Sequence, residues 1–201
     1  MKHFQLLFSL VLFLIPSVLF AQPERSCNTM DYLDIQLQEN PQMEAQMSRI
    51  EQFTQNYINN HNGNSQRAVI TIPTVVHVVY RSSSQNVSTA QIQSQIDVLN
   101  ADFGTKGNSW PQGADSEIAF CLASVDPNGN PTSGITRTST NKRSFSYSND
   151  GVKFNSMGGH DAWPAGDYLN IWVCDLGSGL LGYAQFPGGN AATDGVVIDY
   201  A

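Results

Sequence analysis

Residues 69–80 read Val-Ile-Thr-Ile-Pro-Thr-Val-Val-His-Val-Val-Tyr, and this stretch decides the fold. Its β-branched residues run almost without polar interruption, which is typical of a strand that is buried on both faces. Ser88-Thr89-Ala90-Gln91 then has the sequence of a helix-starting capping box. It is followed by apolar residues at helical spacing, namely Ile92, Ile96, Leu99 and Phe103. We therefore expect a central strand followed by a helix that packs on it.

Further strand-like stretches follow at residues 118–123, 168–176, 181–186 and 195–200. The order of one strand, one helix and several strands predicts an α/β (α+β) fold with a right-handed crossover between the first two strands. The sequence of residues 132–165 shows no clear core pattern and predicts loops and short strands. The stretch 195–200 needs cover on both faces, so we expect the domain to be incomplete at residue 201.

The first 21 residues have the pattern of a secretory signal peptide. Lys2 precedes an apolar stretch at residues 4–20, and Ala21 is a small residue at its end. A membrane anchor is disfavoured because the stretch is short for a span and Pro16 interrupts it. We expect a secreted, extracellular product without a membrane anchor.

A helical block follows at residues 28–60. Met43, Met47, Ile50, Phe53, Tyr57 and Ile58 recur at helical spacing, and a shorter set (Met30, Leu33, Leu37) precedes them. The block cannot form a core alone, so its apolar stripe needs a larger surface to lie on. Residues 61–66 form a polar linker that contains glycine. The chain thus divides into residues 1–21, 22–67 and 68–201.

The charge balance excludes some classes of partner. The formal net charge is −7, and the sequence has no cluster of lysines and arginines. An acidic chain repels phosphate backbones and anionic lipid surfaces, so we expect no nucleic-acid partner and no docking on a membrane surface.

No complete catalytic constellation can be found in the sequence. None of the four histidines has another four residues away, so there is no helical His-Glu-x-x-His pair. His77 lies among valines and is expected to be a hydrogen-bonded core histidine. His160 lies in a Gly-Gly-His-Asp loop, where a surface or turn role is expected.

The sequence contains three cysteines, which is an odd number, and it does not determine which of them form a disulfide. Cys121 and Cys174 lie in apolar strands, where buried and inert thiols are expected. Cys27 lies in a polar stretch, and a thiolate is a good zinc ligand. Cys27 is therefore a candidate to block the open position of a catalytic zinc; the alternatives are a disulfide partner or an unpaired surface thiol.

Five pieces of the chain, in order, resemble the pappalysin/cytophagalysin family of secreted metzincin zinc metalloendopeptidases. They are residues 72–80, the helix 92–103 ending in Leu-Asn-Ala-Asp-Phe, residues 168–174, residues 181–187 and residues 194–198. The resemblance covers about residues 68–201. It implies a metzincin-like upper subdomain, with a twisted, mostly parallel sheet, an antiparallel edge strand and packed helices.

The resemblance also implies a function. Residues 22–67 would be a pro-segment with Cys27 as the cysteine switch, and the substrate would be a peptide or protein. The edge strand bordering the cleft would be Leu181, Gly182, Tyr183, Ala184, Gln185 and Phe186. Zinc is the implied cofactor, and calcium is a further cofactor that the resemblance allows. The family's His-Glu-x-x-His-x-x-Gly-x-x-His helix is absent from these residues, so no catalytic or metal-binding residue is assigned and residues 22–201 are expected to be inactive.

Two other hypotheses stay open. A secreted adhesion or carbohydrate-binding module would use aromatic side chains, for which Trp110, Trp163 and Trp172 are the candidates. A degenerate homologue ending at Ala201 could serve as a decoy or inhibitor. The sequence after Ala201 distinguishes these hypotheses from a protease.

Overall fold

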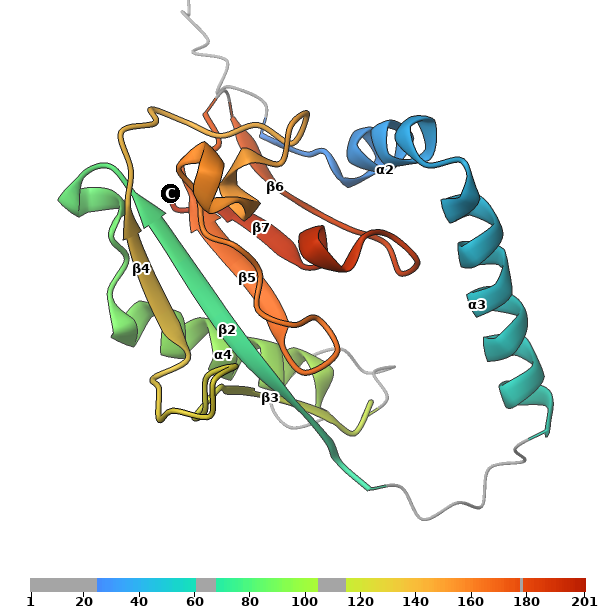
Figure 1. Cartoon of the computed structure of the whole chain (residues 1–201). Helices are drawn as coiled ribbons and strands as arrows, with labels where there is room; N and C mark the ends of the chain where they lie inside the picture. Colours follow the sequence, from blue (N-terminus) through green and yellow to red (C-terminus); the bar gives the residue numbers. More distant parts are fainter. Residues whose placement is uncertain (1–24, 61–67, 105–114, 178) are drawn as a thin grey trace, which may run out of the picture.

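The computed structural model describes residues 25–60, 68–104, 115–177 and 179–201. Within these ranges one seven-stranded sheet has the order β1-β6-β7-β5-β2-β3, and β4 also pairs with β2 (Figure 1). The strands are β1 (Ser26–Cys27), β2 (Ile70–Tyr80), β3 (Ile118–Leu122), β4 (Ile135–Ser139), β5 (Leu169–Cys174), β6 (Leu180–Ala184) and β7 (Val196–Asp199). The helices are α2 (Thr29–Glu39), α3 (Gln42–Asn60) and α4 (Thr89–Phe103). Short 3-10 turns are η1 (Ser83–Gln85), η2 (Gly151–Lys153), η3 (Asn155–Met157) and η4 (Ala191–Thr193).

β2 is the centre of the sheet, as its uninterrupted apolar sequence predicts. It pairs in parallel with β5 on one side and with β3 and β4 on the other. β7 continues the parallel arrangement beside β5, whereas β6 runs antiparallel to β7. The expected α/β fold, with a mostly parallel sheet and an antiparallel strand toward one edge, is therefore confirmed.

The two faces of the sheet carry separate cores. On one face, α4 buries Ile92 against β2 and β5, in a cluster with Val76, Val78, Val87 and Ile171. α4 begins at the predicted cap, where the Ser88 hydroxyl accepts a hydrogen bond from the backbone N–H of Gln91 (3.1 Å). The other core contains Val79, Phe145, Val152, Trp172, Cys174, Leu176, Leu180, Tyr183 and Val197. Tyr32 of α2 belongs to this second core, so the N-terminal block contributes a side chain to the interior of the domain.

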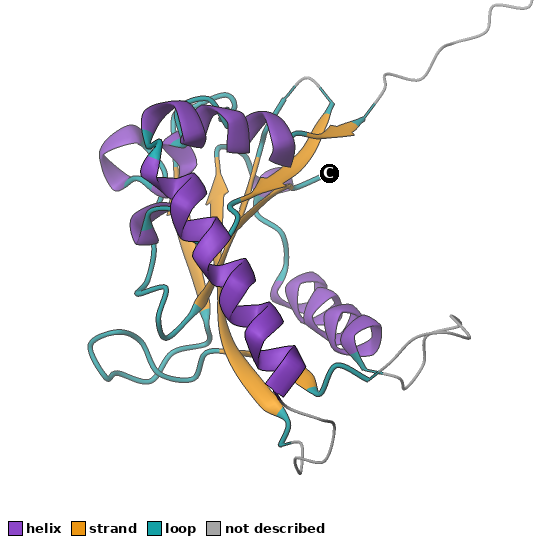
Figure 2. Cartoon of the chain, turned by 90° about the vertical axis from the view of Figure 1, so that its right-hand side faces the viewer, coloured by secondary structure: helices purple, strands orange, loops and turns teal. Residues whose placement is uncertain are grey.

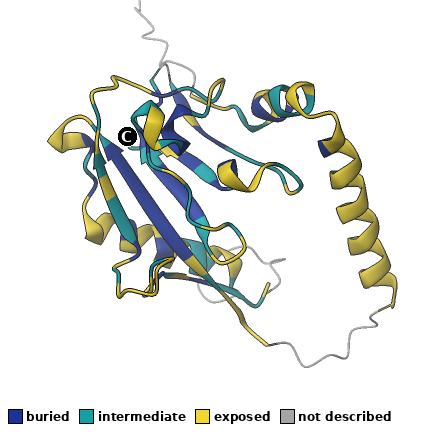
Figure 3. Ribbon diagram, in the orientation of Figure 1, coloured by how far each residue is buried: buried dark blue, intermediate teal, exposed yellow. Residues whose placement is uncertain are grey.

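α3 does not lie on the domain as its apolar stripe led us to expect. Met43 is its buried residue, whereas Phe53 is 71% exposed and Ile58 is 58% exposed. Asn40 ends α2 and the chain turns there, so that α3 runs at an angle to α2 (Figure 2), and only the first turns of α3 approach the body (Figure 3). The stripe is therefore mostly exposed on this part of the chain.

Three features of the sequence lie outside the described residues: the expected signal peptide (residues 1–21), the linker (residues 61–66) and Trp110. Within the described ranges, no helix combines the length and the apolar character that a membrane span requires.

Candidate functional site

The outer edge of β6 is occupied by the N-terminal block. β1 pairs in parallel with β6, placing Cys27 beside Gly182. The backbone N–H groups of Ser26 and Asn28 donate to the carbonyls of Gly179 and Gly182, both at 3.1 Å. The predicted edge strand 181–186 thus exists as β6, with Gln185 and Phe186 beyond its end, and it is the second strand from the edge.

Side-chain contacts extend this pairing at both ends. The Thr29 hydroxyl, at the start of α2, accepts a hydrogen bond from the backbone N–H of Ala184 (3.2 Å). At the other end, the Arg25 guanidinium lies 3.6 Å from the Asp199 carboxylate of β7. The segment 25–29 therefore covers the length of β6.

Cys27 is exposed and forms no disulfide. Its sulfur lies 3.2 Å from the Thr29 hydroxyl. The described residues contain no group of three or more His, Cys, Asp or Glu side chains that could hold a metal ion. They do not form a zinc site by themselves, and Cys27 could supply only one ligand to a metal bound by residues outside the described ranges.

The other two cysteines differ from each other. Cys174 is buried in the core, and this burial raises the pKa of its thiol, as expected of an inert cysteine. Cys121 is exposed, contrary to expectation. Residues alternate between the two faces of β3, and Phe120 takes the buried position, so Cys121 points to the uncovered side.

His77 is the core histidine that its sequence context predicts. It has no exposed surface, Nδ1 lies 2.8 Å from the Thr136 hydroxyl, and Nε2 lies 3.0 Å from the Asn170 amide oxygen. Burial lowers its pKa to about 4, and the neighbouring His160 ring, stacked at 4.4 Å, adds to this lowering. Both nitrogens are engaged, so His77 is not arranged as a metal ligand.

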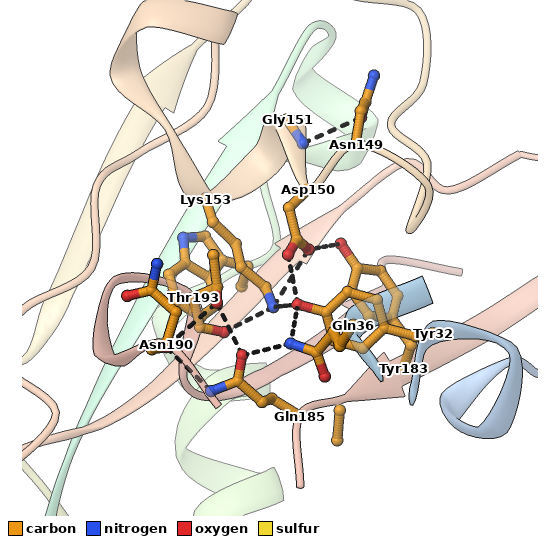
Figure 4. Close-up of polar contacts among 12 residues, drawn as sticks. Tyr32, Gln36, Asn149, Asp150, Gly151, Lys153, Tyr183, Gln185, Asn190 and Thr193 are labelled. Carbon is orange, nitrogen blue, oxygen red and sulfur yellow. Dashed lines mark hydrogen bonds and ion pairs between the residues drawn. The ribbon is translucent and has the colours of Figure 1, made fainter. Parts of the chain in front are cut away.

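A buried polar cluster, which the sequence did not predict, lies between α2 and the sheet (Figure 4). Lys153 of η2 has no exposed surface, and its Nζ lies 3.2 Å from the Asp150 carboxylate. Asp150 also accepts hydrogen bonds from the hydroxyls of Tyr32 and Tyr183. Burial lowers the pKa of Lys153, and burial together with the Asp150 charge raises the pKa of both tyrosines.

The two described tryptophans differ in burial. Trp172 is fully buried, and its indole N–H donates to the backbone carbonyl of His160 (2.8 Å). Trp163 is half-buried and packs edge-on against Tyr168, with ring centroids 4.9 Å apart.

The chain is similar to several known proteins. No family model matches the chain. An extracellular metalloprotease of Arthroderma otae is 28% identical over 135 residues, which are 66% of this chain and 40% of that protein. Mature mirolysin of Tannerella forsythia, solved in complex with a cleaved peptide, is 53% identical, with a TM-score of 0.64 over 67% of this chain and 54% of that one. A mutant of its precursor, promirolysin, is 45% identical, with a TM-score of 0.70 over 87% of this chain and 58% of that one.

These relatives are metalloproteases. The chain spans 40% of the length of the Arthroderma otae protein and somewhat more than half of the mirolysin chains.

Proposed function

We propose that the chain is the N-terminal part of a secreted, zinc-dependent metalloendopeptidase of the pappalysin/cytophagalysin family, in its latent precursor form. The observation that carries the proposal is the similarity to mirolysin. An identity of 53% accompanies a shared backbone over two thirds of the chain, with a TM-score of 0.64. Within the described ranges, the matching part would supply the sheet beside the cleft rather than the metal ligands.

The coverage of the two mirolysin forms supports a pro-segment at residues 22–67. The match to mature mirolysin covers 67% of this chain, whereas the match to promirolysin covers 87%. Residues 68–201 alone make up two thirds of the chain. The additional match therefore corresponds in length to the helical block that precedes the linker.

The pairing of β1 with β6 supports a mechanism of latency. An extended peptide can add a strand to an open sheet edge, with its main chain hydrogen-bonded to the edge. In this structure the carbonyls of Gly179 and Gly182 already accept hydrogen bonds from Ser26 and Asn28. Residues 25–29 would thus exclude a peptide substrate from residues 181–186, and Cys27 would bring a thiolate toward the zinc.

Zinc would polarise the scissile carbonyl and activate a water molecule when it is bound in the complete enzyme. Its ligands and the general base are not assigned to any described residue. A calcium site also remains a proposal, without assigned residues.

The test uses the gene region that encodes residues 22–201 together with whatever sequence follows codon 201. We expect the longer protein to contain the His-Glu-x-x-His-x-x-Gly-x-x-His motif and, after removal of residues 22–67, to hydrolyse peptides until a zinc chelator is added. Purified residues 22–201 are the control and should show no chelator-sensitive hydrolysis. Chelator-sensitive turnover by the control would disprove the assignment of the metal ligands to later residues, and a longer protein without any hydrolysis would disprove the protease proposal.

A further inference from the structure

The cluster around Lys153 joins two parts of the chain that are far apart in sequence. Tyr32 and Gln36 come from α2, whereas Asp150, Lys153, Tyr183 and Gln185 come from the body of the domain (Figure 4). Tyr32 is only 2% exposed, although most of the surrounding helix is polar. A single aromatic side chain of the N-terminal block therefore enters the domain interior.

The Tyr32 hydroxyl uses all of its hydrogen-bonding capacity in this position. It donates to Asp150, and it accepts from Lys153 Nζ (3.2 Å) and from Gln36 Nε2 (3.1 Å). A hydroxyl offers one donor and two acceptor positions, so no position is left open. The recognition is directed at a tyrosine and not at an aromatic ring in general.

Lys153 is equally saturated. Its ammonium group has three protons, and its three oxygen partners are Asp150, the backbone carbonyl of Thr193 (2.7 Å) and Tyr32. The same nitrogen lies 4.7 Å from the Tyr32 ring centroid and 5.1 Å from that of Tyr183. Without the Tyr32 hydroxyl, one proton of a buried cation would have no partner, which is costly.

A second contact binds α2 next to this one. Gln36 Nε2 donates to the Gln185 side-chain oxygen (2.7 Å), which also accepts from the Thr193 hydroxyl (2.7 Å). The Gln36 oxygen, by contrast, is buried and has no hydrogen-bond partner among the described residues. Beside these residues lies a pocket of about 320 Å³, lined by α2 on one side and by Asn149 and Asn190 among others on the other side. The interface is thus polar and incompletely filled, unlike the core of the sheet.

We propose that Asp150, Lys153, Tyr183 and Thr193 form a receptor pocket for Tyr32, and that this pocket is a detachable anchor for the pro-segment, separate from the β1–β6 pairing. The inference rests on the proposed function in one respect, because it takes residues 22–67 to be a segment that leaves the domain. The anchor would hold α2 in place, and through it β1, until the segment is removed.

The experiment measures hydrogen–deuterium exchange on residues 22–201, the chain without its expected signal peptide, and needs no activity assay. Tyr32→Phe keeps the ring and deletes the hydroxyl. The exchange of the α2 amides should become at least about tenfold faster, while β2 and β5 keep their protection. Gln36→Ala should give a smaller increase in the same helix, because Gln36 leaves one of its own polar atoms unsatisfied. Met30→Ala is the matched control, since Met30 lies on the same helix and is 61% exposed.

Two outcomes would overturn the anchor. Unchanged exchange of α2 in Tyr32→Phe would show that the hydroxyl does not hold the helix. An equal acceleration in α2, β2 and β5 would show that Tyr32 is part of the domain's own core and is not detachable. If Tyr32→Phe releases α2 selectively but the longer protein hydrolyses no peptide, the anchor stands and the protease proposal fails.

Discussion

At the scale of single residues, the fold depends on polar side chains that are buried and fully paired. His77 is the clearest case, because both ring nitrogens have partners inside the sheet. The ring is neutral when folded, since burial lowers its pKa from 6.5 to about 4. The folded protein therefore resists protonation at this site, whereas the unfolded chain accepts the proton readily.

This difference predicts a pH dependence of stability. Because the pKa of His77 is lower in the folded state than in the unfolded state, the unfolded state binds more protons between about pH 6.5 and 4. The contribution is present above pH 6.5 and is lost as the pH falls through this window. Between pH 7 and 4.5 the loss is on the order of 2 kcal/mol.

The measurement is urea denaturation at pH 7 and pH 4.5, for the wild type and for His77→Gln. The variant should be less stable at pH 7, and the gap in the free energy of unfolding should shrink by about 2 kcal/mol at pH 4.5. Carboxylates that titrate in the same range affect both proteins and cancel in the comparison. A gap that is constant across the two pH values would contradict the prediction.

Residue-scale predictions from sequence succeeded where the local pattern is sufficient. A histidine among valines on a central strand can hardly avoid burial, so the environment of His77 could be predicted from its neighbours. Lys153 had no such signal, because its partner Tyr32 is 121 residues away and the intervening chain gives no period that links them. The prediction that Cys121 is buried was wrong for a related reason. An apolar strand predicts burial, but only the sheet topology shows which face of the strand is left uncovered.

At the scale of elements, the pairing of β6 with β7 leaves no room for a side chain at Gly182. A Cβ atom at this position would lie 2.5 Å from the Val197 backbone carbonyl oxygen, and backbone atoms cannot move aside easily. The absence of a side chain at Gly182 therefore allows β6 to pair with β7 on one side and with β1 on the other.

Gly182→Ala should destabilise the domain and loosen β6 in particular. We expect a loss of about 1–3 kcal/mol in the free energy of unfolding, the usual range for overpacking. Gly166→Ala is the control, because a Cβ there would have no atom within 4 Å. Thermal and urea denaturation of both variants measure the effect. Equal stability of Gly182→Ala and the wild type would show that the strands can shift at no cost.

Element-scale patterns predicted most of the sheet. The stretch 69–80 corresponds to β2, the stretches 168–176 and 195–200 contain β5 and β7, and the stretch 181–186 overlaps β6, which begins one residue earlier and ends two residues earlier. β1 could not be predicted, because two residues in a polar stretch have no periodicity and become a strand only through the partner they meet. The exposed stripe of α3 also departs from expectation, since helical spacing shows that an apolar face exists but not what covers it.

At the scale of the whole molecule, the N-terminal block is held at two separate places. β1 pairs with the edge of the sheet, and Tyr32 enters the polar pocket on its face. The proposed latency combines this backbone cover with a thiolate from Cys27. Losing the thiol alone should therefore weaken latency without releasing the segment.

If the longer protein is the peptidase proposed above, Cys27→Ala should raise the activity of its unprocessed precursor by at least about tenfold, because a thiolate is a strong zinc ligand and alanine offers none. The activity after removal of residues 22–67 should equal that of the wild type. Cys121→Ala is the control, since this thiol is also exposed but lies on β3, across the sheet from β6. Equal latency of the Cys27→Ala precursor and the wild type would exclude the cysteine switch.

β1 also bears on whether copies of the chain associate with one another. An open strand edge is a template on which a second molecule can assemble, and proteins commonly protect such edges with charges, prolines or bulges. Here the cover on β6 is the two-residue strand β1, which belongs to the segment proposed above to be removed. If residues 22–67 leave the domain as proposed, the precursor would keep β6 covered against self-association, and their removal would open an edge that either a peptide or a second copy of the chain could occupy.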